Sequence, residues 1–195
     1  MSLIEQINTA NLTGDFDTAL RLCDSALSEN PENASFLIGK GNALFGLKRC
    51  EEAIAVYQSA AKADETDALP WANLAGVYYE QRKTDDGLAA CAEALKRDPE
   101  NVNALIHRGN LQIMKEDFSA ALASYETAER NAPADTLVLF NKAHALAELN
   151  RLDEAEAVYT KLAQKSPEDE DVLYALASVL EKDEKFDQAA RTYLR

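Results

Sequence analysis

The sequence predicts an all-α fold, and three observations lead to that prediction. Alanine, the strongest helix former, occupies 34 of the 195 positions. Only 7 Gly and 5 Pro interrupt the chain, and 47% of its residues are hydrophobic against 28% charged, which is a globular balance. Similar residues also return at a fixed interval of 34 positions, which is typical of stacked supersecondary units.

The prolines mark this interval most clearly. Pro99, Pro133 and Pro167 are 34 residues apart, and Pro31 lies two intervals before Pro99. Proline lacks an N–H donor and moves the preceding residue out of the helical region. Each proline is therefore expected to follow the second helix of one unit, with Glu65 in the corresponding place of the remaining unit.

Small and aromatic residues keep the same register and define each unit in turn. No insertion is needed anywhere in the chain. In chain order the units are 1–33 (Ile7, Phe16, Ala19, Cys23, Pro31), 34–67 (Gly41, Cys50, Ala53, Tyr57), 68–101 (Ala75, Thr84, Gly87, Cys91, Pro99), 102–135 (Gly109, Phe118, Ala121, Tyr125, Pro133), 136–169 (Ala143, Leu152, Ala155, Tyr159, Pro167) and a partial unit 170–195 (Ala177, Phe186, Ala189, Tyr193).

The third unit carries the fullest version of the pattern, in Trp71, Leu74, Tyr78, Gly87, Ala94 and Pro99. These residues resemble the tetratricopeptide repeat family, and the resemblance covers the whole chain. It implies a helix, a tight turn and an antiparallel helix in every unit. It also implies a single domain, residues 1–195, folded as a right-handed α–α superhelix, or solenoid, of about six helix pairs.

The spacing of the apolar residues supports this reading independently of the family. Trp71, Leu74, Ala75 and Tyr78 stand at i, i+3, i+4 and i+7, so they form one stripe along a helix. Small residues let two helix axes approach, while large ones fill the gaps between successive units. A stack of such pairs leaves a continuous concave surface open.

Charge and cysteine content restrict the partners and the compartment. The formal net charge is −14, so nucleic acid is excluded as a partner, and the expected ligand is a neutral or basic, partly apolar peptide or protein. Three cysteines without a C-x-x-C pair fit reduced thiols and a cytoplasmic protein. The longest uncharged stretch has 12 residues, too few to span a bilayer, so no membrane partner is expected.

No residue constellation in the sequence predicts catalysis. Cys23, Cys50 and Cys91 fall in apolar columns and are expected to be buried hydrophobes. His107 and His144 lack a third ligand for a metal, and phosphate-loop or hydrolase motifs are absent from the sequence. We therefore expect a protein that is not an enzyme and has no cofactor or metal.

The resemblance places the binding site on the concave face, along the first helix of each unit. The residues carried over as peptide-binding are Asn8, Ile38, Asn42, Phe45, Asn73, Tyr79, Ile106, His107, Asn110, Phe140, Asn141 and His144. Further lining residues are Ile4, Asn103, Ile113, Leu137, Tyr174 and Ser178. The asparagines offer donors and acceptors to a peptide backbone, and the apolar residues offer pockets. The expected function is therefore a noncatalytic scaffold or adaptor that binds an extended or helical peptide of a partner protein in its concave groove.

Family members that hold the carboxylate tails of heat-shock chaperones use cations around two asparagines. Here Asn42 and Asn73 match those asparagines, but Ile38, Asn103 and His107 stand at the cation positions, which disfavours that mode. Two alternatives remain open. One is self-association through the last unit, whose Phe186, Ala189, Tyr193 and Leu194 are expected to lack a covering helix, and the other is a docking segment of a longer enzyme.

Overall fold

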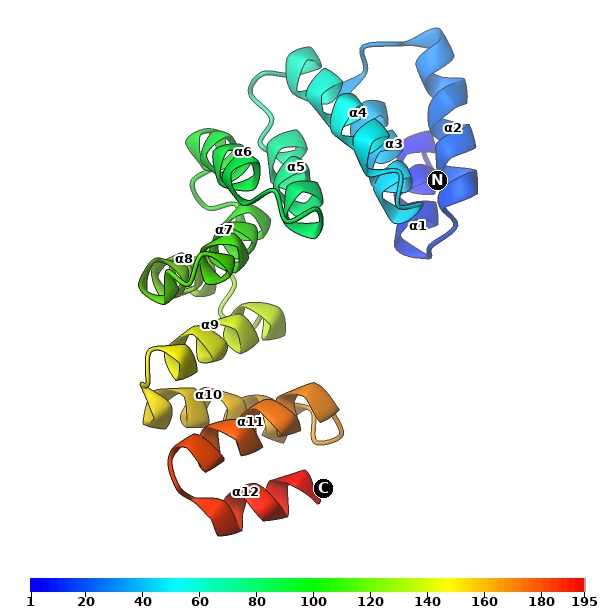
Figure 1. The fold of residues 1–195 in the computed structure, drawn as a ribbon. Helices are drawn as coiled ribbons and strands as arrows, with labels where there is room; N and C mark the ends of the chain where they lie inside the picture. Colours follow the sequence, from blue (N-terminus) through cyan, green and yellow to red (C-terminus); the bar gives the residue numbers. More distant parts are fainter. Residues whose placement is uncertain (195) are drawn as a thin grey trace. The chain divides into compact units, whose positions relative to one another are not determined.

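The computed structural model describes residues 1–194, and these residues form twelve α-helices and no strand (Figure 1). The predicted all-α repeat fold is therefore confirmed. The helices are α1 (Leu3–Leu12), α2 (Phe16–Glu29), α3 (Ala34–Gly46), α4 (Cys50–Ala63), α5 (Leu69–Glu80), α6 (Thr84–Arg97), α7 (Val102–Met114), α8 (Phe118–Asn131), α9 (Thr136–Glu148), α10 (Leu152–Lys165), α11 (Glu170–Lys182) and α12 (Phe186–Tyr193).

The helix ends follow the 34-residue interval. Pro31, Pro99, Pro133 and Pro167 each lie two residues beyond the end of a second helix, and Glu65 has the same place after α4. Asn33, Asp135 and Asp169 begin first helices as N-caps, and their side chains accept hydrogen bonds from backbone N–H groups of the first turn. Each predicted unit thus contains one helix pair.

A left-handed residue makes the tight turn inside every pair. These residues are Gly14, Lys48, Arg82, Glu116, Asn150 and Glu184, at φ between 56° and 79° and spaced by 34 positions. The turn in the second repeat, residues 34–67, shows the bonding: the Arg49 N–H donates to the carbonyl oxygen of Leu44 at 2.9 Å. Five of the six turns adopt this conformation without glycine, so the turn itself gave no signal in the sequence.

The chain divides into two compact units, Met1–His107 and Arg108–Arg195, with the boundary inside α7. In the first unit, Ala72, Ala94 and Ala104 form a small buried cluster beside Trp71. The second unit has a larger apolar core that includes Leu146, Tyr159 and Leu176. The alanine column is fully buried in both, which lets paired helices approach closely. The single-domain assignment stays a prediction.

The last helix pair leaves several large side chains exposed. Phe186 is 64% exposed and Leu194 87%, whereas Ala189 is buried, because α12 packs this side against α11. Phe186, Tyr193 and Leu194 are thus exposed as expected, while Ala189 is covered by the preceding helix α11. No helix among residues 1–194 combines the length and the apolar character that crossing a membrane requires.

Candidate functional site

In the compact unit Met1–His107, two asparagines and one tyrosine join the first helices of successive repeats. The ring of Tyr57, on α4, lies directly over Gly41 of α3, where a β-carbon would come within 2.4 Å of it. Its hydroxyl donates to Oδ1 of Asn42 at 2.6 Å. The same oxygen accepts from Nδ2 of Asn73, on α5, at 3.0 Å. One carbonyl oxygen thus holds two neighbouring repeats together.

The second compact unit, which begins at Arg108, repeats this arrangement 68 positions later. Gly109 lies under the ring of Tyr125, whose hydroxyl donates to Oδ1 of Asn110 at 2.6 Å. Nδ2 of Asn141 donates to the same oxygen at 3.3 Å. We call these two sets the asparagine pairs: Asn42 with Asn73, and Asn110 with Asn141.

The asparagine pairs keep part of their hydrogen-bonding capacity. Within residues 1–194 the amide N–H groups of Asn42 and the carbonyl oxygen of Asn73 make no hydrogen bond, and all four asparagines are half-buried. Burial raises the pKa of Tyr57 above its ordinary value, so the phenol stays a neutral donor. Each pair therefore offers one donor and one acceptor side by side.

Between the third and fourth repeats this arrangement is replaced. Gly76 stands where an asparagine would be, and Cys91 where the tyrosine would be. The imidazole of His107 fills the space, because a β-carbon on Gly76 would lie 3.0 Å from its Nε2. Its Nδ1 is buried without a hydrogen-bond partner among the described residues, and burial lowers its pKa, with an opposing contribution from Glu80. Asparagine and tyrosine are thus lost together here.

The other residues predicted for the site in the first unit are less uniform. Asn8 is exposed, while Ile38 and Phe45 are half-buried, and Lys48 Nζ lies 5.8 Å from the centre of the Phe45 ring. Tyr79 is half-buried, with its ring centre 6.4 Å from that of His107. Ile106 is only 6% exposed, because it packs into the interior, so it offers a ligand little surface. The five asparagines predicted for the site thus form two bonded pairs and a separate Asn8.

Two adjoining hollows lie along α9 and α11 in the second unit. The larger, about 440 Å³, gathers the predicted residues Phe140, His144, Tyr174 and Ser178, with Tyr159 of α10. The Phe140 and Tyr159 rings meet edge to face at 5.4 Å. The smaller hollow, about 310 Å³, is lined by Leu137 and Phe140 and by parts of α10 and α11. The structure therefore brings together most of the groove residues predicted for these repeats.

Sequence reasoning missed three charged residues of this region. Asp171 lines both hollows, while Glu148 and Lys182 line the larger one and form an ion pair at 3.0 Å. Asp171 is the second residue of its repeat, and the other two are the thirteenth residues of theirs. The resemblance implies a concave set made of the second, fifth, sixth, ninth, twelfth and thirteenth positions of each unit, so carrying that set over completely identifies these three residues.

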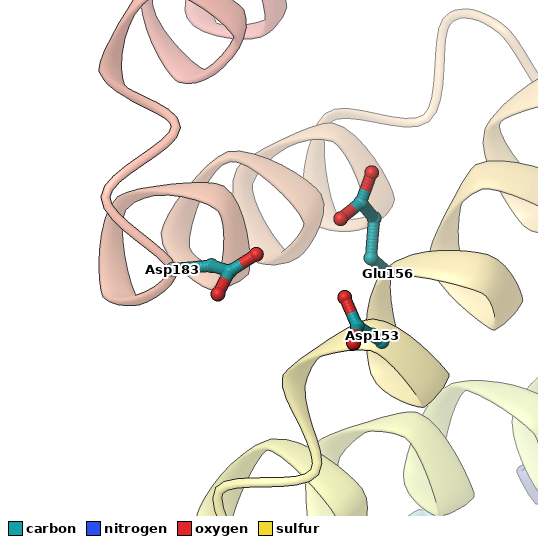
Figure 2. Close-up of side chains that lie close together, drawn as sticks. All are labelled: Asp153, Glu156 and Asp183. Carbon is teal, nitrogen blue, oxygen red and sulfur yellow. The ribbon is translucent and has the colours of Figure 1, made fainter.

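A separate acidic cluster lies at the turn of the last repeat. Figure 2 shows Asp153 and Glu156 on α10 close to Asp183, and oxygens of the three groups lie within 4.8 Å of one another. Nζ of Lys185 lies 2.6 Å from Asp183, 2.7 Å from Glu156 and 3.7 Å from Asp153. These bonds raise the pKa of Lys185, and the ammonium already neutralises part of the cluster, which is therefore a salt-bridge network.

The cysteines differ in burial. Cys23 and Cys91 are buried as predicted, whereas Cys50 is only half-buried at the start of α4. Burial raises the pKa of Cys23 to about 11, and the neighbouring Asp24 adds to the shift. A thiol with so little thiolate at neutral pH is a poor nucleophile.

Comparison with known proteins identifies the repeat. Models of the tetratricopeptide repeat match residues 12–76, and also 73–136, 108–170 and 140–195. A protein STIP1 homolog of Dictyostelium discoideum is 31% identical over 59% of the chain, and Hsp70-Hsp90 organizing protein 3 of Arabidopsis thaliana is 21% identical over 57%. These relatives are much longer, because the matches cover only 22% and 20% of their lengths.

Solved structures agree on the fold. PilF of Pseudomonas aeruginosa superposes with a TM-score of 0.85 at 19% identity, over 97% of this chain and 86% of its own. YrrB, described as a tetratricopeptide repeat protein with an unusual peptide-binding site, gives a TM-score of 0.72 at 24% identity, over 87% of this chain and 88% of its own. With family models matching from residue 12 to residue 195, the chain belongs to the tetratricopeptide repeat family.

Proposed function

We propose that this protein is a noncatalytic adaptor that binds an extended segment of a partner protein along the inner faces of its first helices. The proposal is carried by the two asparagine pairs, each of which keeps one hydrogen-bond donor and one acceptor unused. The bonds from Tyr57 and Tyr125 to Asn42 and Asn110 already join the two helices of each of these repeats. The remaining polar atoms are what a partner chain would use.

The chemistry fits a polypeptide backbone. A peptide unit presents one C=O and one N–H, which match the Asn42 amide N–H and the Asn73 carbonyl oxygen without regard to side chain. The second pair offers the same match through Asn110 and Asn141. Half-exposed Phe45, Tyr79 and Phe140, at the neighbouring positions, supply apolar contacts that add sequence preference.

The partner class follows from charge. A net charge of −14 favours a neutral or basic, partly apolar segment. The names of the relatives point to partners among chaperones, but the tail-binding mode remains disfavoured because Ile38, Asn103 and His107 hold no permanent positive charge. We place the protein in the cytoplasm, since its three free thiols fit a reducing compartment.

The test replaces Asn73 and Asn141, the member of each asparagine pair that accepts no bond from a tyrosine. Asn73→Ala with Asn141→Ala removes the free acceptors but leaves the tyrosine bonds to Asn42 and Asn110 in place. Peptides selected from a random library on the folded chain are then titrated by calorimetry. We expect the double variant to bind about 1 to 3 kcal/mol more weakly, the usual loss for hydrogen bonds at a partly buried site.

The matched control is Asn30→Ala, at the exposed end of α2, which should leave binding unchanged. Urea midpoints of all variants separate lost binding from lost folding. Equal affinity of the wild type and the Asn73/Asn141 double variant would remove the asparagine pairs from the site.

A second candidate function is self-association through the last repeat. The observation in its favour is the exposure of Phe186, Tyr193 and Leu194 together with Tyr174, which is 68% exposed. Sedimentation across a hundredfold range of concentration tests it, with Phe186→Ser as the variant. A monomer at every concentration rules this function out. A third reading, a docking segment of a longer enzyme, is tested by the length and domain content of the natural protein.

A further inference from the structure

The two hollows along α9 and α11 form one composite site. Phe140 lines both, so the two compartments, of about 310 and 440 Å³, meet at this residue. Each volume accommodates one large side chain of a partner, since small-molecule pockets of similar size hold whole ligands. Asp171 is the other residue common to both compartments. A carboxylate therefore lies at the rim where two bound apolar side chains would meet.

The charges around this rim do not cancel. Glu148 is neutralised by Lys182 at 3.0 Å. Asp169 uses one oxygen to cap α11, accepting from the N–H of Val172 at 3.2 Å, and forms no ion pair within residues 1–194. Asp171 is exposed and makes no hydrogen bond or ion pair within residues 1–194. The site thus presents the carboxylates of Asp169 and Asp171, and that of Asp171 is open to a cation of the partner.

We propose that this composite site selects an extended segment in which a lysine or arginine lies between two apolar residues. The inference rests on the proposed function and deepens it. In an extended chain, residues i and i+2 point to the same side, so they enter the two compartments on either side of Phe140. The basic residue at i+1 has a long flexible stem, and its charged end reaches the exposed Asp171 at the rim. An acidic residue at i+1 is repelled by Asp169 and Asp171.

Blocked pentapeptides test this directly. The probes are acetyl-Ala-Leu-Lys-Leu-Ala-amide, the same peptide with Gln or Glu in place of Lys, and acetyl-Ala-Ala-Lys-Ala-Ala-amide. Each is titrated into the folded ¹⁵N-labelled chain at low salt, and amide shifts are followed along α9 and α11. We expect the Lys peptide to bind about two- to fivefold more tightly than the Gln peptide, as an exposed ion pair allows. The Glu peptide should bind more weakly than the Gln peptide. The peptide in which Ala replaces both Leu should bind more weakly than the Lys peptide that keeps them.

Asp171→Asn is the test variant and Glu168→Gln the matched control. Both remove one negative charge from the same end of the second unit, but Glu168 lines neither hollow. The preference for Lys over Gln should fall to near unity in Asp171→Asn and persist in Glu168→Gln. Urea midpoints confirm that both variants fold.

Each other outcome overturns a defined part of the inference. Equal affinity of the Lys and Gln peptides for the wild type refutes basic selection, and an unchanged preference in Asp171→Asn refutes the role of that carboxylate. Equal binding of the Leu and Ala peptides refutes the two compartments. Failure of the asparagine pairs is read separately, because the Asn73/Asn141 double variant is tested with library-selected peptides, whereas the Lys to Gln ratio is measured with pentapeptides at hollows that neither asparagine lines.

Discussion

Replacing Gly41 by alanine tests whether the asparagine pair depends on the glycine beneath its tyrosine. Helix propensity alone predicts a gain of about 1 kcal/mol, since Gly41 lies inside α3. The structure predicts the opposite sign. A β-carbon there would lie 2.4 to 2.8 Å from three ring atoms of Tyr57, whose side chain is only 1% exposed.

The expected loss can be worked out from these contacts. Overpacking a close-packed site costs about 1 to 3 kcal/mol. A shifted ring also loses the 2.6 Å bond from its hydroxyl to Asn42, worth about 1 kcal/mol. These losses exceed the propensity gain, so we expect a net destabilisation of about 1 to 3 kcal/mol. The fifth repeat differs at two of these positions, because Ala143 replaces the glycine and His144 replaces the asparagine, and there the Tyr159 hydroxyl lies 3.5 Å from the Phe140 carbonyl instead.

A double-mutant cycle with Tyr57→Cys isolates the cause. The third repeat naturally combines Ala75 with Cys91, so Gly41→Ala should be neutral or stabilising once Tyr57 is cysteine. Urea titration followed by far-ultraviolet circular dichroism measures each midpoint, and amide shifts of α3 and α4 report local unfolding, since repeat proteins can unfold in parts. A higher midpoint for Gly41→Ala alone, or the same loss in both backgrounds, would refute the steric argument.

Three further predictions use other parts of the chain. Trp71→Ala should cost about 3 kcal/mol, at the low end for aromatic truncation, because the ring is half-buried beneath Arg97; an unchanged urea midpoint contradicts this. The lowered pKa of His107 means that its neutral form stabilises the fold above pH 6.5, and this contribution is lost as pH falls further; His107→Gln should therefore flatten the acid limb of a midpoint-against-pH curve. Cys50 should react with a thiol reagent at pH 8 faster than Cys23, which is buried; equal rates would contradict the assigned burial.

Much of the fold was predictable from the sequence because the repeat encodes it locally. The prolines mark helix ends, and the column of Ala19, Ala53 and their equivalents marks the close helix contacts, so register and pairing follow from residue spacing alone. The left-handed turns were not predictable, because residues such as Lys48 and Glu116 carry no preference for positive φ. Those turns are enforced by the helices on both sides.

The sequence predicted which residues gather around the hollow on α9 and α11, but it did not predict the hydrogen bonds of the asparagines. Family positions identified Phe140, His144 and Tyr174, which the structure gathers around one hollow. The same positions could not show that Asn42 and Asn110 spend their carbonyl oxygens on buried tyrosines. The paired occurrence of Gly-Asn with a tyrosine fifteen residues after the asparagine is a signal in the sequence, and it becomes readable only once that geometry is known.

The sequence by itself determined the helix pairs, their register and the faces they bury, because these depend on the period of apolar and small residues along the chain. Only the tertiary structure decided which polar atoms of the groove remain free and which apolar residues enclose a hollow. Hydrogen bonds and cavities arise between side chains from different repeats, so they depend on how neighbouring helices meet. Asn73 and Asp171 illustrate the difference, since both lie at positions of the concave set. The Asn73 side chain uses its amide N–H in a bond to Asn42, whereas the Asp171 side chain lines a hollow and is open to a partner.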